Sequence, residues 1–230
     1  MKKRIGLQGF FMFLGVVAIL FCSKYIIVGF RQQIVDELLD ALGMLIVLLG
    51  YFLRIAARGC KTDMNPDGKT LVMKGPYALM RNPMYFGTLL IGLGVVLILF
   101  RWWVGLVFLG IYLAIYIPQI NREENKLSSL FGDTFAEYCK KTPQFFPGII
   151  ALFTTHPRDY LCLKLSWIRK ERFSLIIIFC VIEAIESWED LRLFGYIKYQ
   201  EELLKIFLVA VAAGGIYLVS YKKNGVSGKD

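Results

Sequence analysis

The sequence predicts an all-α, polytopic membrane protein with about six transmembrane helices. The chain of 230 residues is 57% hydrophobic and has a mean hydropathy of +0.55, which is too apolar for a soluble domain of this size. Six apolar stretches are long enough to be membrane helices, and those shorter than about 20 residues are expected to be tilted or partly enclosed by protein. They are residues 5 to 23, 41 to 57, 84 to 100, 102 to 118, 173 to 188 and 203 to 221.

The order of these stretches predicts the topology. The first follows a basic N-terminus, as a signal peptide would, but no convincing small-residue cleavage pattern comes after it, so we interpret it as a span. Spans three and four are separated by Arg101 alone and should form a tight helical hairpin. With the N-terminus inside, 21 of the 27 Lys and Arg residues lie in inner segments. We therefore expect both termini in the cytoplasm.

The charge and the metal-binding residue types exclude several kinds of partner. The net charge of +9 follows from this asymmetry and indicates contact with anionic lipid headgroups rather than with nucleic acid. Five scattered cysteines, none in a Cys-x-x-Cys spacing, predict neither a disulfide framework nor a metal cluster. His156 is the single histidine and precedes a proline, so a histidine-based metal site is not expected. We expect membrane lipids as partners, and neither nucleic acid nor metal.

Polar residues crowd the entrance to the third span, in the stretch GPYALMRNPMYFG from Gly75 to Gly87. Asn82 is a favoured N-cap and Pro83 suits the first helical position, so the span should begin there. The N–H groups of this helix start, together with Arg81, suit a carboxylate or a phosphate. The alternative is a capped helix with a snorkelling arginine.

The same stretch carries aromatic and small residues. Tyr77 and Tyr85 offer aromatic faces that can stack on a flat base or contact a cation. Gly87 allows close approach of another group. The alternative interpretation is that the tyrosines are ordinary interfacial anchors.

A second polar segment, residues 121 to 148, continues the fourth span beyond the membrane. Glu123 and Glu124 are about 100° apart on a helix, so one can face a cavity while the other faces solvent or a cation. Leu127 shares the face of Glu124. Thr134 and Glu137 resemble a capping box that opens a short interfacial helix. This helix should end at Thr142-Pro143, and it could close the cavity. The alternative is a solvated charged turn.

Taken together across the hairpin, the two segments fit one ligand. An arginine at a helix start suits an anion, a glutamate suits an ammonium or sulfonium, and tyrosines suit a base or a cation. S-adenosylmethionine carries all of these groups. The hairpin therefore predicts a pocket for this cofactor on the cytoplasmic side.

These residues resemble the integral-membrane methyltransferase family that includes isoprenylcysteine carboxyl methyltransferases and phospholipid methyltransferases. The resemblance covers residues 40 to 148 and implies a cofactor pocket between helices, without a Rossmann sheet. Its motifs are Gly75-Pro76-Tyr77, Arg81-Asn82-Pro83-Met84-Tyr85 with Gly87, Glu123-Glu124, Leu127, Phe131-Gly132, Tyr138 and the ending from Thr142-Pro143 to Pro147. The expected cofactor-binding residues are Tyr77, Arg81, Asn82, Pro83, Tyr85, Gly87, Glu123, Glu124 and Leu127, with Arg81 and Glu124 also catalytic.

One departure leaves the acceptor open. The carboxyl methyltransferase branch usually has histidine where this chain has Asn82, whereas the phosphatidylethanolamine branch is similar in reading Asn-Pro-Met-Tyr. We expect a lipidic or prenylated acceptor, in the first instance of the isoprenylcysteine carboxyl type and alternatively a phospholipid amine. An NADPH-dependent membrane reductase of the sterol or steroid type and a non-enzymatic transporter or scaffold are the remaining alternatives.

The expected organisation has three parts. Residues 1 to 40 hold the first span and a connecting segment, residues 41 to 148 form the methyltransferase core, and residues 149 to 230 add an extension with two further spans. The resemblance does not reach the extension, for which we predict only that it flanks the core.

Overall fold

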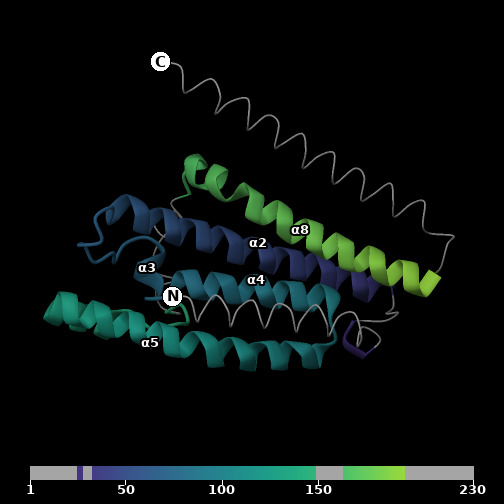
Figure 1. Cartoon of the computed structure of the whole chain (residues 1–230), viewed down its shortest axis with the longest axis horizontal. Coiled ribbons are helices and arrows are strands. Elements are labelled where there is room, and N and C mark those ends of the chain that lie inside the picture. Colours follow the sequence, from purple (N-terminus) through teal and green to yellow (C-terminus); the bar gives the residue numbers. More distant parts are fainter. Residues whose placement is uncertain (1–24, 28–32, 149–162, 195–230) are drawn as a thin grey trace, which may run out of the picture. The chain divides into compact units, whose positions relative to one another are not determined.

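The computed structural model describes residues 25–27, 33–148 and 163–194, and the ordered elements within these ranges are helices (Figure 1). They are α2 (Gln33–Met64), α3 (Pro76–Leu79), α4 (Pro83–Leu99), α5 (Trp102–Lys141) and α8 (Leu165–Phe194). No strand occurs in these ranges beyond a single antiparallel bridge between Ile27 and Phe100. The predicted all-α class is therefore confirmed for this part of the chain.

Glycines bring α2 and α4 into close contact. A Cβ atom added at Gly50 would lie 2.6 Å from the backbone oxygen of Gly87, and one added at Gly94 would lie 2.6 Å from that of Gly43. Small residues at such positions let two helix backbones approach, which is the usual way for membrane helices to pack. This packing places the beginning of α4 beside the final turns of α2, where the polar residues lie.

The predicted hairpin of spans three and four is present. α4 ends at Leu99 and α5 begins at Trp102, and α4 lies between α2 and α5 (Figure 1). The short segment 25–27 holds the closed end of the hairpin, because the backbone N–H of Arg101 donates to Ile26 O at 3.0 Å. The Nε–H of Arg101 donates in addition to Ile27 O at 3.3 Å. The open end of the hairpin carries the two polar segments.

α5 is a continuous helix only as far as Gly132. There the backbone takes φ 49° and ψ −122°, a left-handed conformation that favours glycine, and the helix resumes in a new direction. The expectation that the fourth span continues beyond its apolar part is thus confirmed. The last part of α5 corresponds to the predicted short helix, and it ends before Thr142 as expected.

Two of the described helices are long and apolar enough to cross a membrane, Glu37–Met64 within α2 and all of α5, while α4 is apolar but has only 17 residues. Four leucines at helical spacing are exposed on α2, which leaves an apolar stripe for lipid to cover. They are Leu38, Leu42, Leu45 and Leu49. These features make the protein a membrane protein. The predicted spans at 5 to 23 and 203 to 221 lie outside the described residues.

Contacts divide the chain into two units, Met1–Glu171 and Arg172–Asp230. α8 begins in the first unit, where the side chain of Trp167 is buried against Gly59 at the end of α2. Lys164 forms an ion pair there with Asp63. In the second unit α8 covers the stretch predicted as the fifth span. The predicted domain boundaries after residues 40 and 148 stay predictions.

Candidate functional site

The junction between α3 and α4 begins the site. Gly75 has φ 64°, α3 is a single turn that starts at Pro76, and Met80 is extended before the chain enters α4. The predicted start of the helix at Pro83 is confirmed, and Pro83 is buried. The predicted capping role of the Asn82 side chain is wrong, because this side chain makes no cap hydrogen bond.

The Asn82 side chain turns instead toward α5. Its Nδ2 donates to Glu124 Oε1 at 2.8 Å and to the backbone oxygen of Gln144 at 3.1 Å. The charged acceptor makes the bond to Glu124 a strong one, and in this orientation the amide oxygen of Asn82 accepts no bond from the N–H groups of the helix start. Asn82 therefore links the α4 entrance to Glu124.

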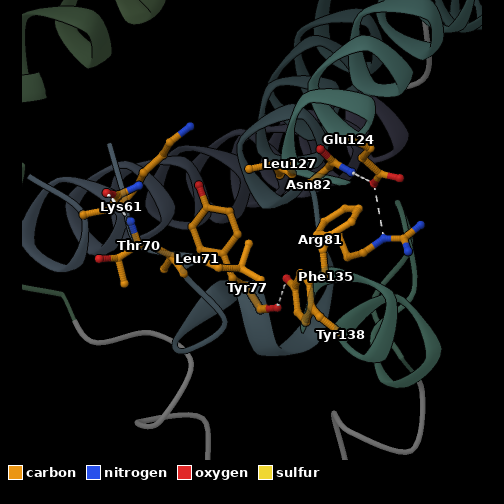
Figure 2. A pocket seen from close by; sticks show the side chains of 12 residues that line it. Lys61, Thr70, Leu71, Tyr77, Arg81, Asn82, Glu124, Leu127, Phe135 and Tyr138 are labelled. Carbon is orange, nitrogen blue, oxygen red and sulfur yellow. Dashed lines mark hydrogen bonds and ion pairs between the residues drawn. The ribbon is translucent and has the colours of Figure 1, made fainter. Parts of the chain in front are cut away.

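Arg81 and Glu124 form an ion pair in the same place. Arg81 Nε lies 3.2 Å from Glu124 Oε1, and the two side chains are 13% and 15% exposed (Figure 2). The Nε atom is buried and makes no hydrogen bond, so the contact is an attraction of charges in which the N–H is not directed at the carboxylate. A buried N–H without a hydrogen bond makes the pair less stable, because the cost of removing this donor from water is not offset.

Gln144 completes the surroundings of Glu124. Its Nε2 donates to Glu124 Oε2 and to Asn121 Oδ1, both at 3.2 Å. Glu124 thus accepts from two amides and contacts one guanidinium. Gln144 was not among the predicted site residues, because Thr142-Pro143 indicates only the end of a helix. A polar side chain just after that end is the one sequence feature that could have identified Gln144.

The residues after α5, which we call the closing segment (142–148), cover the α3–α4 junction. The backbone N–H of Arg81 donates to Pro143 O at 2.9 Å, and that of Gly148 donates to Leu79 O at 3.2 Å. Two phenylalanine rings of the segment pack against Phe86 at centroid distances of 5.8 and 6.0 Å. The closing segment is therefore attached by both backbone and apolar contacts.

Tyr77 and Tyr138 join the other side of the junction to the end of α5. The hydroxyl of Tyr138 donates to the backbone oxygen of Tyr77 at 2.6 Å. Burial raises the pKa of the Tyr77 phenol, and the neighbouring Tyr138 raises it further. The Tyr77 side chain is consequently neutral across the physiological pH range.

A cavity of about 70 Å³ lies between these side chains. Its lining residues come from α2, the following loop, the α3–α4 junction and α5; they are Lys61, Asn65, Thr70, Leu71, Val72, Tyr77, Arg81, Asn82, Glu124, Leu127, Phe135 and Tyr138. In Figure 2, Lys61 and Thr70 lie at one end, Arg81 and Glu124 at the other, and Tyr77 between them. One end of the cavity is therefore cationic, because it has Lys61, and the other end has a positive and a negative charge, on Arg81 and Glu124.

Five of the predicted site residues line this cavity, and four do not. Tyr85 and Glu123 lie apart from it and bond to each other, with the Tyr85 hydroxyl 2.7 Å from Glu123 Oε1. Gln119 Nε2 donates to the same oxygen at 2.7 Å. Glu124 lines the cavity, as expected for one of the two glutamates, whereas Glu123 accepts from a hydroxyl and an amide and does not face the expected solvent or cation.

The remaining two predicted residues, Pro83 and Gly87, have structural roles in the start of α4 and in its packing on α2. Pro83 is buried at the first position of α4. Gly87 faces α2, where an added Cβ atom would lie 2.7 Å from Gly50 O. Lys61 and Asn65, by contrast, line the cavity without having been identified, because only the packing of α2 on α4 brings them there and no motif marks them.

Comparison with known proteins places this arrangement in a family. Residues 12–134 match the phospholipid methyltransferase family. The chain belongs to this family. The match includes the α3–α4 junction and both glutamates, and it covers the residues that line the cavity except Phe135 and Tyr138. No solved structure matches the chain.

Two relatives align with parts of the chain. It is 37% identical over 116 residues to the cobalt-zinc-cadmium resistance protein CzcN of Cupriavidus metallidurans, across 50% of this chain and 52% of that protein. It is 35% identical over 79 residues to the protein-S-isoprenylcysteine O-methyltransferase of Schizosaccharomyces pombe, across 34% of each. The chain therefore spans about half or less of the length of these relatives.

Proposed function

We propose that the protein is an S-adenosylmethionine-dependent methyltransferase that acts on a lipidic acceptor at the membrane. The observation that carries the proposal is the Arg81–Glu124 pair, which lines a cavity at the polar ends of apolar helices in a chain of a methyltransferase family. We place the cavity and both termini on the cytoplasmic side, because the basic residues gather there.

The residues present fit the cofactor. Its amino acid part carries a carboxylate and an ammonium, for which Arg81 and Glu124 are the matching charges. Tyr77 and Leu127 offer an aromatic face and an apolar surface to its base. The unsatisfied Arg81 N–H is a donor that a ligand carboxylate would satisfy.

Binding requires the site to open. The cavity of about 70 Å³ is below the roughly 300 Å³ at which small-molecule sites begin. Arg81 and Glu124 would separate so that each can pair with the ligand, and the closing segment would release Gln144 from Glu124. The backbone and phenylalanine contacts of the closing segment, formed again over the ligand, would exclude water.

The chain's part in the reaction is mainly alignment. The bound cofactor supplies a methyl group activated by its sulfonium. Methyl transfer proceeds by in-line displacement, so the protein must hold the nucleophile on the correct axis and keep water out. Arg81 would orient a carboxylate acceptor, which needs no base. For an amine acceptor, Glu124 would accept the proton once Gln144 has released its second oxygen.

The acceptor is lipidic in this proposal, and it enters from the bilayer because its tail leaves the membrane only at high cost. A carboxylate of the isoprenylcysteine type is the first candidate, supported by the S. pombe relative. An amine headgroup is the second, and it is favoured by Asn82 in the position where the carboxyl branch carries histidine, together with the family match.

Two measurements test the proposal. A thermal-shift comparison of the purified protein with S-adenosylhomocysteine and with NADPH should show stabilisation by the former alone, which would also exclude the reductase alternative. Incubation with methyl-labelled cofactor and native lipid extracts should then yield a labelled lipid. Stabilisation by NADPH alone, or no labelled product from any extract, would contradict the proposal.

A further inference from the structure

The last two turns of α2 have one face toward the cavity and another toward the beginning of α8. Gly59 and Asp63 are four positions apart, so they share a face of the helix, and the chain around the start of α8 contacts both of them. Lys61 and Asn65 have the same spacing and line the cavity. Lys61 lies about 200° around the helix axis from Gly59. A shift of this short piece of α2 would therefore move a wall of the cavity.

Trp167 fills a space that a glycine of α2 leaves open. A Cβ atom added at Gly59 would lie 2.0 Å from the Trp167 ring, and Trp167 is only 7% exposed. Glycine is less favourable than alanine inside a helix, and the burial of the indole against Gly59 offsets this loss. A tryptophan that only anchors a helix at the membrane surface would keep its ring in the interface. The ring of Trp167 is instead part of the packing of α2.

Lys164 adds a charged contact on the same face of α2. Its ammonium forms an ion pair with Asp63 and lies 5.2 Å from the centre of the Trp167 ring. The Lys164 side chain is 59% exposed, and exposed ion pairs stabilise a protein only slightly. We therefore assign the main contact to Trp167.

The end of α2 lies beyond the glycine contacts that hold this helix against α4. These contacts run along α2 from Gly43 to Arg54, which Gly87 of α4 approaches. α2 continues to Met64, about 15 Å further along its axis. Trp167 therefore packs on the part of α2 that the glycine contacts do not reach, and this part includes Lys61.

We propose that Trp167 is a positioning residue that holds Lys61 at the nucleoside end of the bound cofactor. The inference rests on the proposed function, in which the amino acid part of the ligand lies at Arg81 and Glu124. Lys61 lies at the opposite end of the cavity, with Tyr77 between the two ends (Figure 2). Adenine nitrogens and ribose oxygens accept hydrogen bonds, and the Lys61 ammonium has three N–H groups to donate.

The consequence concerns the part of the chain beyond the family match. That match ends at residue 134, so the beginning of α8 lies outside it. In this proposal α8 acts on the cavity from the outer face of α2 and touches no ligand. The affinity for the cofactor then depends on a segment that the family match does not include.

The test is isothermal titration calorimetry of the full chain in detergent with S-adenosylhomocysteine. The variants are Trp167→Ala, Lys61→Ala and the double variant, and Trp167→Phe keeps an aromatic ring at the contact. The matched control is Trp102→Ala, which removes the same side chain where it is 77% exposed. Melting temperatures show that each variant is folded, and Trp167→Phe replaces Trp167→Ala in the comparison if the latter does not fold.

We expect Lys61→Ala and Trp167→Ala each to weaken binding about fivefold, because a donor to the ligand is removed or displaced. The double variant should bind as Lys61→Ala does, since Trp167 acts through Lys61. Trp167→Phe should bind with intermediate affinity, and Trp102→Ala should bind normally. Wild-type affinity in Lys61→Ala, or effects of the two substitutions that multiply, would overturn the inference.

Hydrogen–deuterium exchange of the ligand-free protein reports on the end of α2 itself. The amides of residues 59 to 65 should exchange faster in Trp167→Ala than in the wild type, and Trp102→Ala should leave them unchanged. Unchanged exchange in Trp167→Ala would overturn the inference, because the end of α2 would then be held without the indole.

The same measurements separate this inference from the proposed function. Equal binding of S-adenosylhomocysteine by the wild type and Trp167→Ala would refute the role of Trp167 and leave the proposed function standing. Absence of binding by the folded wild type would refute the proposed function, and with it the ligand that the inference assigns to Lys61.

Discussion

Asn82 and Glu124 lie 42 positions apart in the sequence, and the amide of the first donates to the carboxylate of the second at 2.8 Å. This bond joins the beginning of α4 to the polar half of α5 at the open end of the hairpin. Because Arg81 and Gln144 contact the same carboxylate, Glu124 is the point at which three chain segments meet. Most of the predictions concern this point.

Replacement of Glu124 by glutamine should weaken the binding of S-adenosylhomocysteine by about tenfold or more, because a charged partner of the ligand's ammonium is lost. Isothermal titration calorimetry measures the effect. Glu137→Gln, which neutralises an exposed carboxylate on the same helix, is the control and should bind normally. Equal affinities of the two variants would contradict the assigned role of Glu124.

Asn82→Ala should lower the free energy of unfolding by about 1–3 kcal/mol, because Glu124 loses a donor while the start of α4 loses no cap. Asn82→Asp should lower the free energy of unfolding further, since it places a second carboxylate beside Glu124. Thermal unfolding in detergent gives the ranking, with exposed Asn125→Ala as the reference. A smaller loss of stability in Asn82→Asp than in Asn82→Ala would show that repulsion between the two carboxylates is unimportant.

Gln144→Ala should accelerate both association and dissociation of S-adenosylhomocysteine, because the closing segment loses its side-chain bond to Glu124 and keeps its backbone bonds. Stopped-flow measurements resolve the two rates, and each is expected to rise by a few-fold. If the dissociation rate rises and the association rate stays the same, Gln144 contacts the ligand and does not control its entry.

Gly87→Ala should destabilise the protein by about 1–3 kcal/mol, because its Cβ atom would meet the backbone of α2 and no flexible side chain can give way. Gly110→Ala is the matched control, since an added Cβ there has no neighbour within 4 Å. The control should be neutral or slightly stabilising, as alanine favours a helix over glycine. Similar melting temperatures for both variants would refute the tight α2–α4 contact.

Tyr77 should make stability decline at high pH. Its pKa is raised in the folded protein, so the folded state holds a proton that the unfolded chain releases from about pH 10. The stabilisation is therefore complete below pH 10 and is lost as the pH rises toward the folded pKa. Burial also raises the pKa of Tyr138, so titration of tyrosinate absorbance should show a late step to which both phenols contribute, and Tyr77→Phe should reduce its amplitude by the share of one phenol. An unchanged titration curve in that variant would place the late step elsewhere.

The sequence predicted the elements that depend on local pattern. The hairpin around Arg101, the start of α4 at Pro83 and the continuation of α5 follow from apolar length and proline position, and the structure has them. The separate surroundings of Glu123 and Glu124 follow from helical periodicity. These features need no information about distant contacts.

The features that escaped prediction depend on tertiary contacts. The bond from Asn82 to Glu124 replaces the expected cap because α5 brings a carboxylate within reach. Gln144 enters the site only through the return of the chain over Leu79 and Arg81. Lys61 lines the cavity because glycines draw α2 against α4. A single sequence shows none of these approaches.

The closing segment is bound to the α3–α4 junction partly through main-chain atoms, Arg81 N to Pro143 O and Gly148 N to Leu79 O. Such bonds persist when side chains are exchanged. If the proposed function holds, substitution at Gln144, Phe145 or Phe146 would therefore change the side chains beside the site while the closing segment stays attached through its backbone. For protein engineering, these three positions are the natural place to diversify a library aimed at new acceptors.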